Sequence, residues 1–145
     1  MRSKVMAALA LAVSVMIIPV ALLAHHGTAA FENDKKVTVK GTVTEWLWSN
    51  PHCLLGVDVK DDDGKVVHWV GEVQNPVSMT NVGWSKAAIK VGDEVTITLL
   101  PVKNGLPLGR LVSVLLPNGK TLQSGEGASR EVREELERQA RESRP

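Results

Sequence analysis

Alternation of apolar and polar residues is clearest at residues 37–47, where it predicts a long β-strand. Threonine and lysine occupy most of the alternate positions, and the apolar face consists of Val37, Val39, Val43 and Leu47. A period of two is typical of a half-buried strand. Gly41 interrupts the apolar face, which predicts a bulge or a sharp bend in a strand that closes a barrel.

Four more strands are predicted from apolar runs bounded by turn residues: Cys53–Lys60, Val66–Glu72, Glu94–Leu100 and Leu108–Leu116. Asp61–Gly64 has the composition of a hairpin turn. That turn predicts antiparallel pairs whose residue numbers sum to near 125. His52 is then expected opposite about Val73, with Glu72 and Trp69 close by.

The segment from Asn75 to Ala88 has no strand pattern, and Ser85 is a candidate cap for one helical turn, Lys86–Ile89. Three strands, a short helical connection and two further strands follow the order of an OB-type barrel. We therefore predict an all-β fold, a small five-stranded OB-like barrel over residues 37–122. An open five-stranded sandwich is the alternative, and the bend expected at Gly41 favours the barrel.

A polar tail, residues 123–145, follows the predicted barrel. Ser129–Ser143 pairs acidic and basic residues at the i,i+4 spacing that supports a helix, as in Glu134 and Arg138. Its apolar stripe consists of Val132, Leu136 and Ala140, which is too thin to predict firm docking. A charged, solvated C-terminal helix is expected, and a partner-binding helix is the alternative.

The N-terminus predicts export. Met1–Lys4 is basic, and Val5–Leu23 is almost wholly apolar. The run is long enough for a membrane helix, but its terminal position, Pro19 and the small residue Ala24 favour a signal peptide over residues 1–24. Cleavage after Ala29 or Ala30 is the alternative. The expected mature protein is periplasmic or secreted, has no membrane span, and begins with a flexible segment, residues 25–36.

Charge and composition argue against a nucleic-acid partner. The whole chain has a net charge of +1, from 17 Lys and Arg against 16 Asp and Glu. Removal of Arg2 and Lys4 with the leader leaves 15 basic residues against 16 acidic ones, a net charge of −1. Phosphate binding needs a basic excess, and single-strand binding needs several stacking rings, whereas this chain has four Trp, one Phe and no Tyr.

His25 and His26 are the first candidate metal ligands. Cleavage after Ala24 would make His25 the mature N-terminus, where its α-amine and imidazole could chelate one Cu(II). Amine and imidazole nitrogens in a tetragonal site suit Cu(II), the strongest divalent binder of the first row. The alternative is an accidental histidine pair in a loose terminus.

The segment Trp48–Cys53 supplies the second candidate. Asn50–Pro51 predicts a turn, after which His52 opens a strand at the barrel rim, near Glu72. A histidine and a carboxylate at one rim form half of a metal site, although His52 could instead have a structural role in the turn. Cys53, the only cysteine, is interpreted as a small buried group rather than as a ligand. His68 is interpreted as an ordinary strand residue.

The copper-binding hypothesis has two competitors. Four tryptophans, Trp46, Trp48, Trp69 and Trp84, could form a barrel face that binds a small ligand or a periplasmic protein without catalysis. Trp46 and Trp48 are expected on one face of their strand, opposite Val43 and Leu47. A copper-dependent oxidative enzyme is the third hypothesis. No nucleophile motif is present, so catalysis stays open and a non-catalytic role is favoured.

Several short segments, in order along the chain, resemble an exported bacterial family of unknown function, DUF6152: Ala24–Gly27, Val39–Val43, Asn50–His52, Trp69–Glu72, Gly83–Trp84 and Val91–Val95. The resemblance extends from roughly Ala24 to Leu122. It implies a small periplasmic β-barrel-like domain and assigns no activity. The Ser129–Pro145 extension lies outside it.

Overall fold

The long first strand, β1 (Val37–Leu47), pairs with two different neighbours along its length and so turns a sheet into a barrel. The computed structural model describes residues 30–126 and 130–143. The other elements within these residues are β2 (Cys53–Lys60), β3 (Val66–Val73), α2 (Pro76–Asn81), β4 (Glu94–Pro101), β5 (Leu108–Leu115), β6 (Thr121–Gln123) and α3 (Arg130–Glu142).

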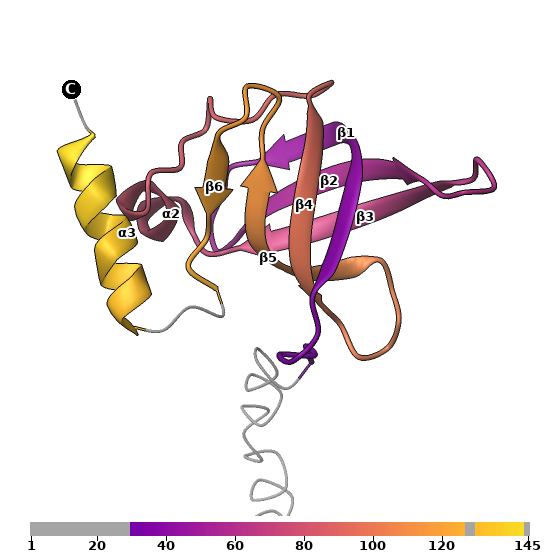
Figure 1. Cartoon of the computed structure of the whole chain (residues 1–145), viewed down its shortest axis with the longest axis horizontal. Coiled ribbons are helices and arrows are strands. Elements are labelled where there is room, and N and C mark those ends of the chain that lie inside the picture. The colour runs from indigo at the N-terminus through magenta and orange to yellow at the C-terminus, as the bar shows by residue number, and fades with distance from the viewer. Residues whose placement is uncertain (1–29, 127–129, 144–145) are drawn as a thin grey trace, which may run out of the picture. The chain divides into compact units, whose positions relative to one another are not determined.

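The strand order β3-β2-β1-β4-β5 is closed by a parallel pairing of β3 with β5 (Figure 1). Val37–Thr42 of β1 pairs with β4, and Thr42–Leu47 pairs with β2. The fold is therefore all-β with a closed five-stranded OB-like barrel, as the sequence predicted, and the β3–β5 pairing excludes the open sandwich. The short β6 pairs with β5 and was not predicted.

A bulge in β1 corrects the predicted assignment of faces. The register with β2 shifts between Val43 and Glu45, so one extra residue lies on β1. Val43 pairs with Val57 and Trp46 pairs with Leu55, both buried partners, so Trp46 and Val43 share the inner face. Leu47, predicted inside with Val43, is instead 42% exposed. A single extra residue reverses the alternation because side chains alternate with a period of two.

Gly41 lies where β1 leaves β4 for β2. A Cβ atom at this position would overlap the backbone carbonyl of Asp58 and approach Cγ1 of Val57 at 2.9 Å. The absence of a side chain lets the two strands approach closely at the bend. The predicted bend is thus found close to Gly41, while the bulge itself lies after Val43.

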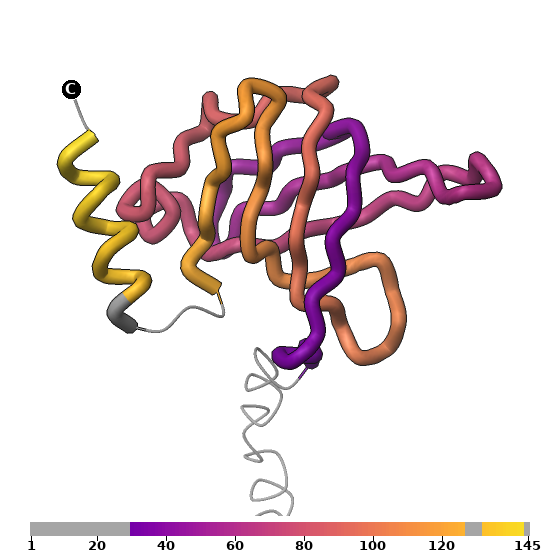
Figure 2. The backbone as a smooth tube through the Cα atoms, viewed as in Figure 1, coloured from indigo at the N-terminus to yellow at the C-terminus, as the bar shows by residue number. Residues whose placement is uncertain are grey.

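The β2–β3 hairpin has a register one residue away from the predicted value. Lys60 pairs with Val66 and Cys53 with Val73, a sum of 126. The backbone amide of Asp61 donates to the carbonyl of Lys65 at 2.9 Å, so the loop has three residues and ends at Gly64, with φ 79°. Figure 2 shows this hairpin extending past the other strands.

The helix between β3 and β4 begins earlier than predicted. Asn75 caps α2, with its side-chain oxygen accepting from the amide of Ser78 at 3.0 Å, and Pro76 occupies the first turn. Both residues suit those positions, because a cap needs a short acceptor and proline lacks the amide hydrogen that would be left unpaired there. The predicted helical turn at Lys86–Ile89 is wrong: these residues form turns and bends.

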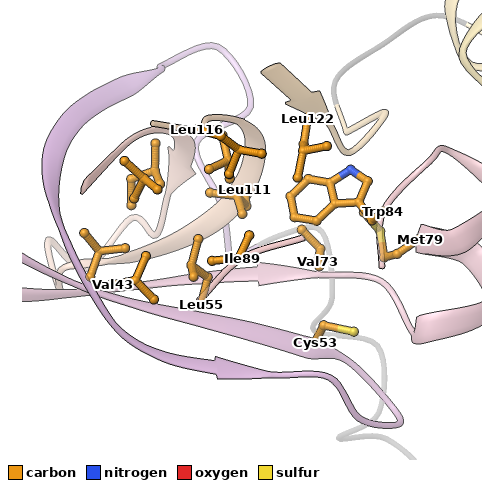
Figure 3. Packing of buried hydrophobic residues seen from close by; sticks show 14 of the residues in the cluster. Val43, Cys53, Leu55, Val73, Met79, Trp84, Ile89, Leu111, Leu116 and Leu122 are labelled. Atoms are coloured by element: carbon orange, nitrogen blue, oxygen red, sulfur yellow. The ribbon is translucent and has the colours of Figure 1, made fainter. Parts of the chain in front are cut away.

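The inner faces of the strands form one hydrophobic core, with Trp84 at its end next to α2. Trp84 is 1% exposed, and Figure 3 shows its ring beside Leu122, Val73 and Met79. Its indole Nε1 donates to the carbonyl of Gln123 at 2.8 Å. The 75–88 segment therefore closes one end of the barrel.

The C-terminal helix α3 packs against the segment that follows α2, through part of its apolar stripe. Ala140 is 8% exposed, and a Cβ atom on Gly83 would lie 3.6 Å from the Cβ of Ala140. Val132, in the same predicted stripe, is 50% exposed. The outer surface carries ion pairs from Arg138 to Glu135 and to Glu142. The helix is charged as predicted, and its C-terminal half packs more closely than a free solvated helix would.

Candidate functional site

His52 and Glu72 form a close side-chain pair at one rim of the barrel. The Nδ1 atom of His52 lies 2.5 Å from Oε1 of Glu72, with the two side chains 53% and 26% exposed. An ionised carboxylate can only accept, so the proton of the pair belongs to Nδ1 of His52. The Nε2 atom is then the imidazole nitrogen with a lone pair for a ligand.

The one-residue difference in register accounts for this pairing. Glu72 pairs with Leu54, so the continuation of β2 places His52 diagonally from Glu72 on the outer face. Diagonal neighbours on one face lie within reach of long side chains. With His52 opposite Val73, as predicted, Glu72 would have pointed to the other face. Trp69 pairs with Val57 on the inner face and so does not lie beside His52 as expected.

A pocket of about 300 Å³ opens beside this pair, and charged or polar side chains form most of its wall. Its lining consists of His52, Glu72, Val73, Gln74, Arg110, Glu126 and Arg133. Arg110 enters the wall because β5 runs parallel to β3, with Arg110 beside Glu72. Glu126 lies 3.6 Å from Arg110 and accepts a hydrogen bond from Nε2 of Gln74 at 3.2 Å.

Four residues of the pocket wall were not predicted from the sequence: Gln74, Arg110, Glu126 and Arg133. They come from β5, the end of β3 and the C-terminal segment, and no local spacing links them to His52. Only the parallel β3–β5 pairing brings Arg110 next to Glu72. These residues could be identified from the sequence only if it were already known which strands are neighbours in the barrel.

His68 forms a second histidine–carboxylate pair on the outer face of the same hairpin. Its Nδ1 atom lies 2.7 Å from Oδ1 of Asp58, and the two side chains are 53% and 41% exposed. The pair joins directly opposite residues of β2 and β3. His68 therefore has the partnered strand position expected of it, and it does not line the pocket beside His52.

Three of the four tryptophans come together at one end of the barrel. The ring centroid of Trp46 lies 5.5 Å from that of Trp48 and 5.9 Å from that of Trp84. Trp46 and Trp48 are partly buried against the core, and Trp84 is part of it. Trp69 is separate from this cluster, opposite Val57. The cluster packs the barrel end, and a continuous face of four exposed rings is not formed.

Cys53 lies in the core with no exposed surface. Burial raises the pKa of its thiol, because the charged thiolate is disfavoured away from water, and a weak contact with the carbonyl of Ser49 opposes this effect. The neutral thiol therefore persists at physiological pH. This agrees with its interpretation as a small buried group.

His25 and His26 lie outside the described residues. The described part of the chain begins at Ala30, and Phe31 is already packed into the barrel at 7% exposure, bridged to Val102. The guanidinium carbon of Arg110 lies 4.8 Å from the centre of the Phe31 ring. Phe31 therefore contacts a residue of the pocket wall, Arg110.

Within residues 30–126 and 130–143, no group of three or more His, Cys, Asp or Glu side chains is arranged to hold a metal ion. His52 and Glu72 therefore do not belong to such a group within these residues. In the same described residues, no helix has the length and apolar character needed to cross a membrane.

Comparison with known proteins identifies one relationship. The model of a family of unknown function, DUF6152, matches residues 12–110, more than half of the chain. No curated protein and no solved structure matches the chain. The match includes His25, His26, His52 and Glu72, together with Arg110, and it ends before Glu126.

Proposed function

Since the chain belongs to this family of unknown function, we propose a role from its own residues: an exported copper-binding protein in which His52 joins the histidines of the mature N-terminus. The close contact between Nδ1 of His52 and the carboxylate of Glu72 is the observation that carries the proposal. It leaves Nε2 of His52 available at the pocket rim. Metal-binding histidines commonly donate their other ring N–H to a carboxylate, which orients the ring and raises its basicity.

Glu72 then positions His52 instead of binding the metal. Oε1 of Glu72 contacts Nδ1 of His52, so this oxygen is engaged with the imidazole rather than with the metal. The metal would be held by Nε2 of His52 and by nitrogens from the N-terminus. Nitrogen ligands of this kind favour Cu(II) over the other divalent first-row metals.

The N-terminal histidines precede the first residue that packs on the barrel by only a few positions. His26 precedes Phe31 by five residues, and Phe31 packs on Arg110 of the pocket wall. Extended chain spans about 3.3–3.6 Å per residue, so five residues bridge up to ~17 Å. If cleavage follows Ala24, the α-amine and imidazole of His25 would supply two nitrogens and His26 a further imidazole.

The test is a Cu(II) titration of the protein exported to the periplasm, followed by calorimetry and electron paramagnetic resonance. We expect an intact mass that begins at His25 and one bound copper with nitrogen hyperfine structure. His25→Ala and His52→Ala should each weaken binding by at least about tenfold, since each removes a direct ligand.

His68→Ala is the matched control. His68 is as exposed as His52, at 53%, and also has a carboxylate partner, but it does not line the pocket. Its removal should leave copper affinity unchanged. Parental affinity in both His25→Ala and His52→Ala would refute the site. A mature mass that begins at Ala30 or Phe31 would remove both terminal histidines and also refute it.

A further inference from the structure

The pocket beside His52 is lined by two arginines and two carboxylates, and both carboxylates already contact other side chains. Glu72 contacts Nδ1 of His52, and Glu126 contacts Arg110 and accepts a hydrogen bond from Gln74. The second arginine of the wall, Arg133, comes from α3. Both acidic side chains of the wall therefore already have partners before Arg133 is considered.

Most N–H groups of the Arg133 guanidinium have no acceptor among the described residues. Within residues 30–126 and 130–143, its guanidinium donates one hydrogen bond, from one terminal nitrogen to the carbonyl of Gly125 at 3.2 Å. A guanidinium carries five N–H donors in a planar fork. The hydrogen bond to Gly125 anchors the side chain at the pocket while most of the fork stays available. A planar fork of donors matches the two oxygens of a carboxylate.

We infer that this pocket binds a small molecule bearing one carboxylate, with Arg133 as its principal cationic contact. The volume of about 300 Å³ lies at the lower end of the range for small-molecule pockets, so it suits a small ligand. A monoanion is favoured over a phosphate dianion because Glu72 and Glu126 line the same wall and would repel the second charge. The inference goes beyond the proposed copper site and does not require the metal.

The C-terminal segment provides the specificity of this pocket. Glu126 and Arg133 both follow residue 110, where the family match ends, whereas His52, Glu72 and Arg110 lie within it. The family region thus supplies the rim and one guanidinium, from Arg110, and the segment beyond it adds a second, from Arg133. The ligand preference is accordingly a property of this chain's extension rather than of the family region.

The test uses the copper-free mature protein and sodium acetate as the probe, at ionic strength held constant with sodium chloride. Nitrogen-15 NMR follows the Nε–Hε signals of Arg133 and Arg110 together with the backbone amides. We expect saturable shifts centred on the pocket. Arg133→Gln should weaken acetate binding by at least about tenfold, the usual effect of losing a charge-assisted contact. Arg133→Lys, which keeps the charge without the fork, should bind with intermediate affinity.

Arg138→Gln is the control, because Arg138 lies on the same helix and is held by Glu135 and Glu142 away from the pocket. It should bind acetate like the parent. Amide spectra that match the parent establish that each variant is folded. Absence of saturable acetate binding, or equal binding by Arg133→Gln, would overturn the inference. Tighter binding of inorganic phosphate than of acetate would overturn the choice of a carboxylate. Because no copper is present, any of these results leaves the proposed copper site to its own test.

Discussion

Two histidine–carboxylate pairs lie on the outer face of the β2–β3 hairpin, and they differ in their surroundings. His52 with Glu72 borders a polar pocket, whereas His68 with Asp58 lies across the middle of the hairpin, outside that pocket. In each pair Nδ1 is the imidazole nitrogen that contacts the carboxylate. The chemistry at this scale is the same, so any functional difference must come from neighbouring groups.

Glu72→Gln should lower copper affinity by about 10- to 100-fold, the usual effect of losing the carboxylate that orients a metal-binding histidine. The amide can still accept from Nδ1 but carries no charge, so the imidazole becomes a weaker donor to the metal. Calorimetric titration with Cu(II) measures the change. Asp58→Asn makes the same substitution beside His68 and should leave the affinity unaltered. Equal losses in both variants would contradict a specific role for Glu72.

Cys53 predicts a pH dependence of stability. Burial raises the pKa of its thiol in the folded protein, so above the ordinary thiol pKa the unfolded chain loses a proton that the folded protein retains. The folded state then binds more protons, and the free energy of unfolding must fall as pH rises through this range. Below the ordinary pKa both states are protonated, and this contribution is constant.

Urea unfolding of the parent and of Cys53→Ala at pH 7 and pH 10 measures this effect. Other groups also titrate between these values, so the difference between the two proteins isolates the thiol. We expect the parent to lose more stability than Cys53→Ala on going to pH 10. An identical loss in both would show that the thiol ionises equally in the folded and unfolded states.

At the scale of single elements, β1 decides the geometry of the whole sheet. Its first half pairs with β4 and its second half with β2, and the change of partner coincides with Gly41 and Thr42. The bulge after Val43 then rotates Trp46 to the inner face, where it meets Trp84. The change of partner and the bulge lie within a few residues of each other. Both are needed because β1 pairs with β4 along its first half and with β2 along its second half.

Gly41→Ala should destabilise the protein by about 3 kcal/mol, since the added Cβ would overlap the backbone carbonyl of Asp58 and a backbone atom cannot rotate away. Gly64→Ala is the comparison. Gly64 has φ 79° and open space around it, so the expected cost is only the ~1 kcal/mol of the left-handed conformation. Chemical denaturation followed by circular dichroism gives both values. A smaller cost at Gly41 than at Gly64 would show that β1 and β2 can separate there.

At the scale of the whole molecule, contacts distant in sequence join the C-terminal segment to the barrel. Ala140 packs near Gly83, and Arg133 bonds to Gly125. The same segment contributes Glu126 and Arg133 to the pocket that borders His52. Packing of α3 and completion of the pocket are therefore coupled.

Ala140→Gln should loosen α3, because a larger polar side chain would meet the surface at Gly83. We expect trypsin to cleave within α3 about tenfold faster. A fall of about 1.4 kcal/mol in the free energy of local opening makes the cleavable open state about ten times more populated. Mass spectrometry of the digest gives the rate. Val132→Gln, at a position 50% exposed, should cleave at the parental rate. Faster cleavage in both variants would indicate a general effect on helix propensity.

The sequence alone was sufficient to predict the five barrel strands, the β-barrel and the family. Each of these depends on local patterns: alternation, turn residues and short motifs. The earlier helix at Pro76–Asn81 also had a local signal, in Asn75 and Pro76, that was missed.

Tertiary structure alone decided which residues surround His52. The three-residue loop sets the register that puts Glu72 on its face, and the parallel β3–β5 pairing brings Arg110 alongside. The C-terminal segment adds Glu126 and Arg133 from far along the chain. Residues become neighbours in this way only when the barrel closes, which brings together strands that are distant in sequence. Each residue contributes only a small part of the free energy of that closure. No local spacing in the sequence therefore encodes these neighbours.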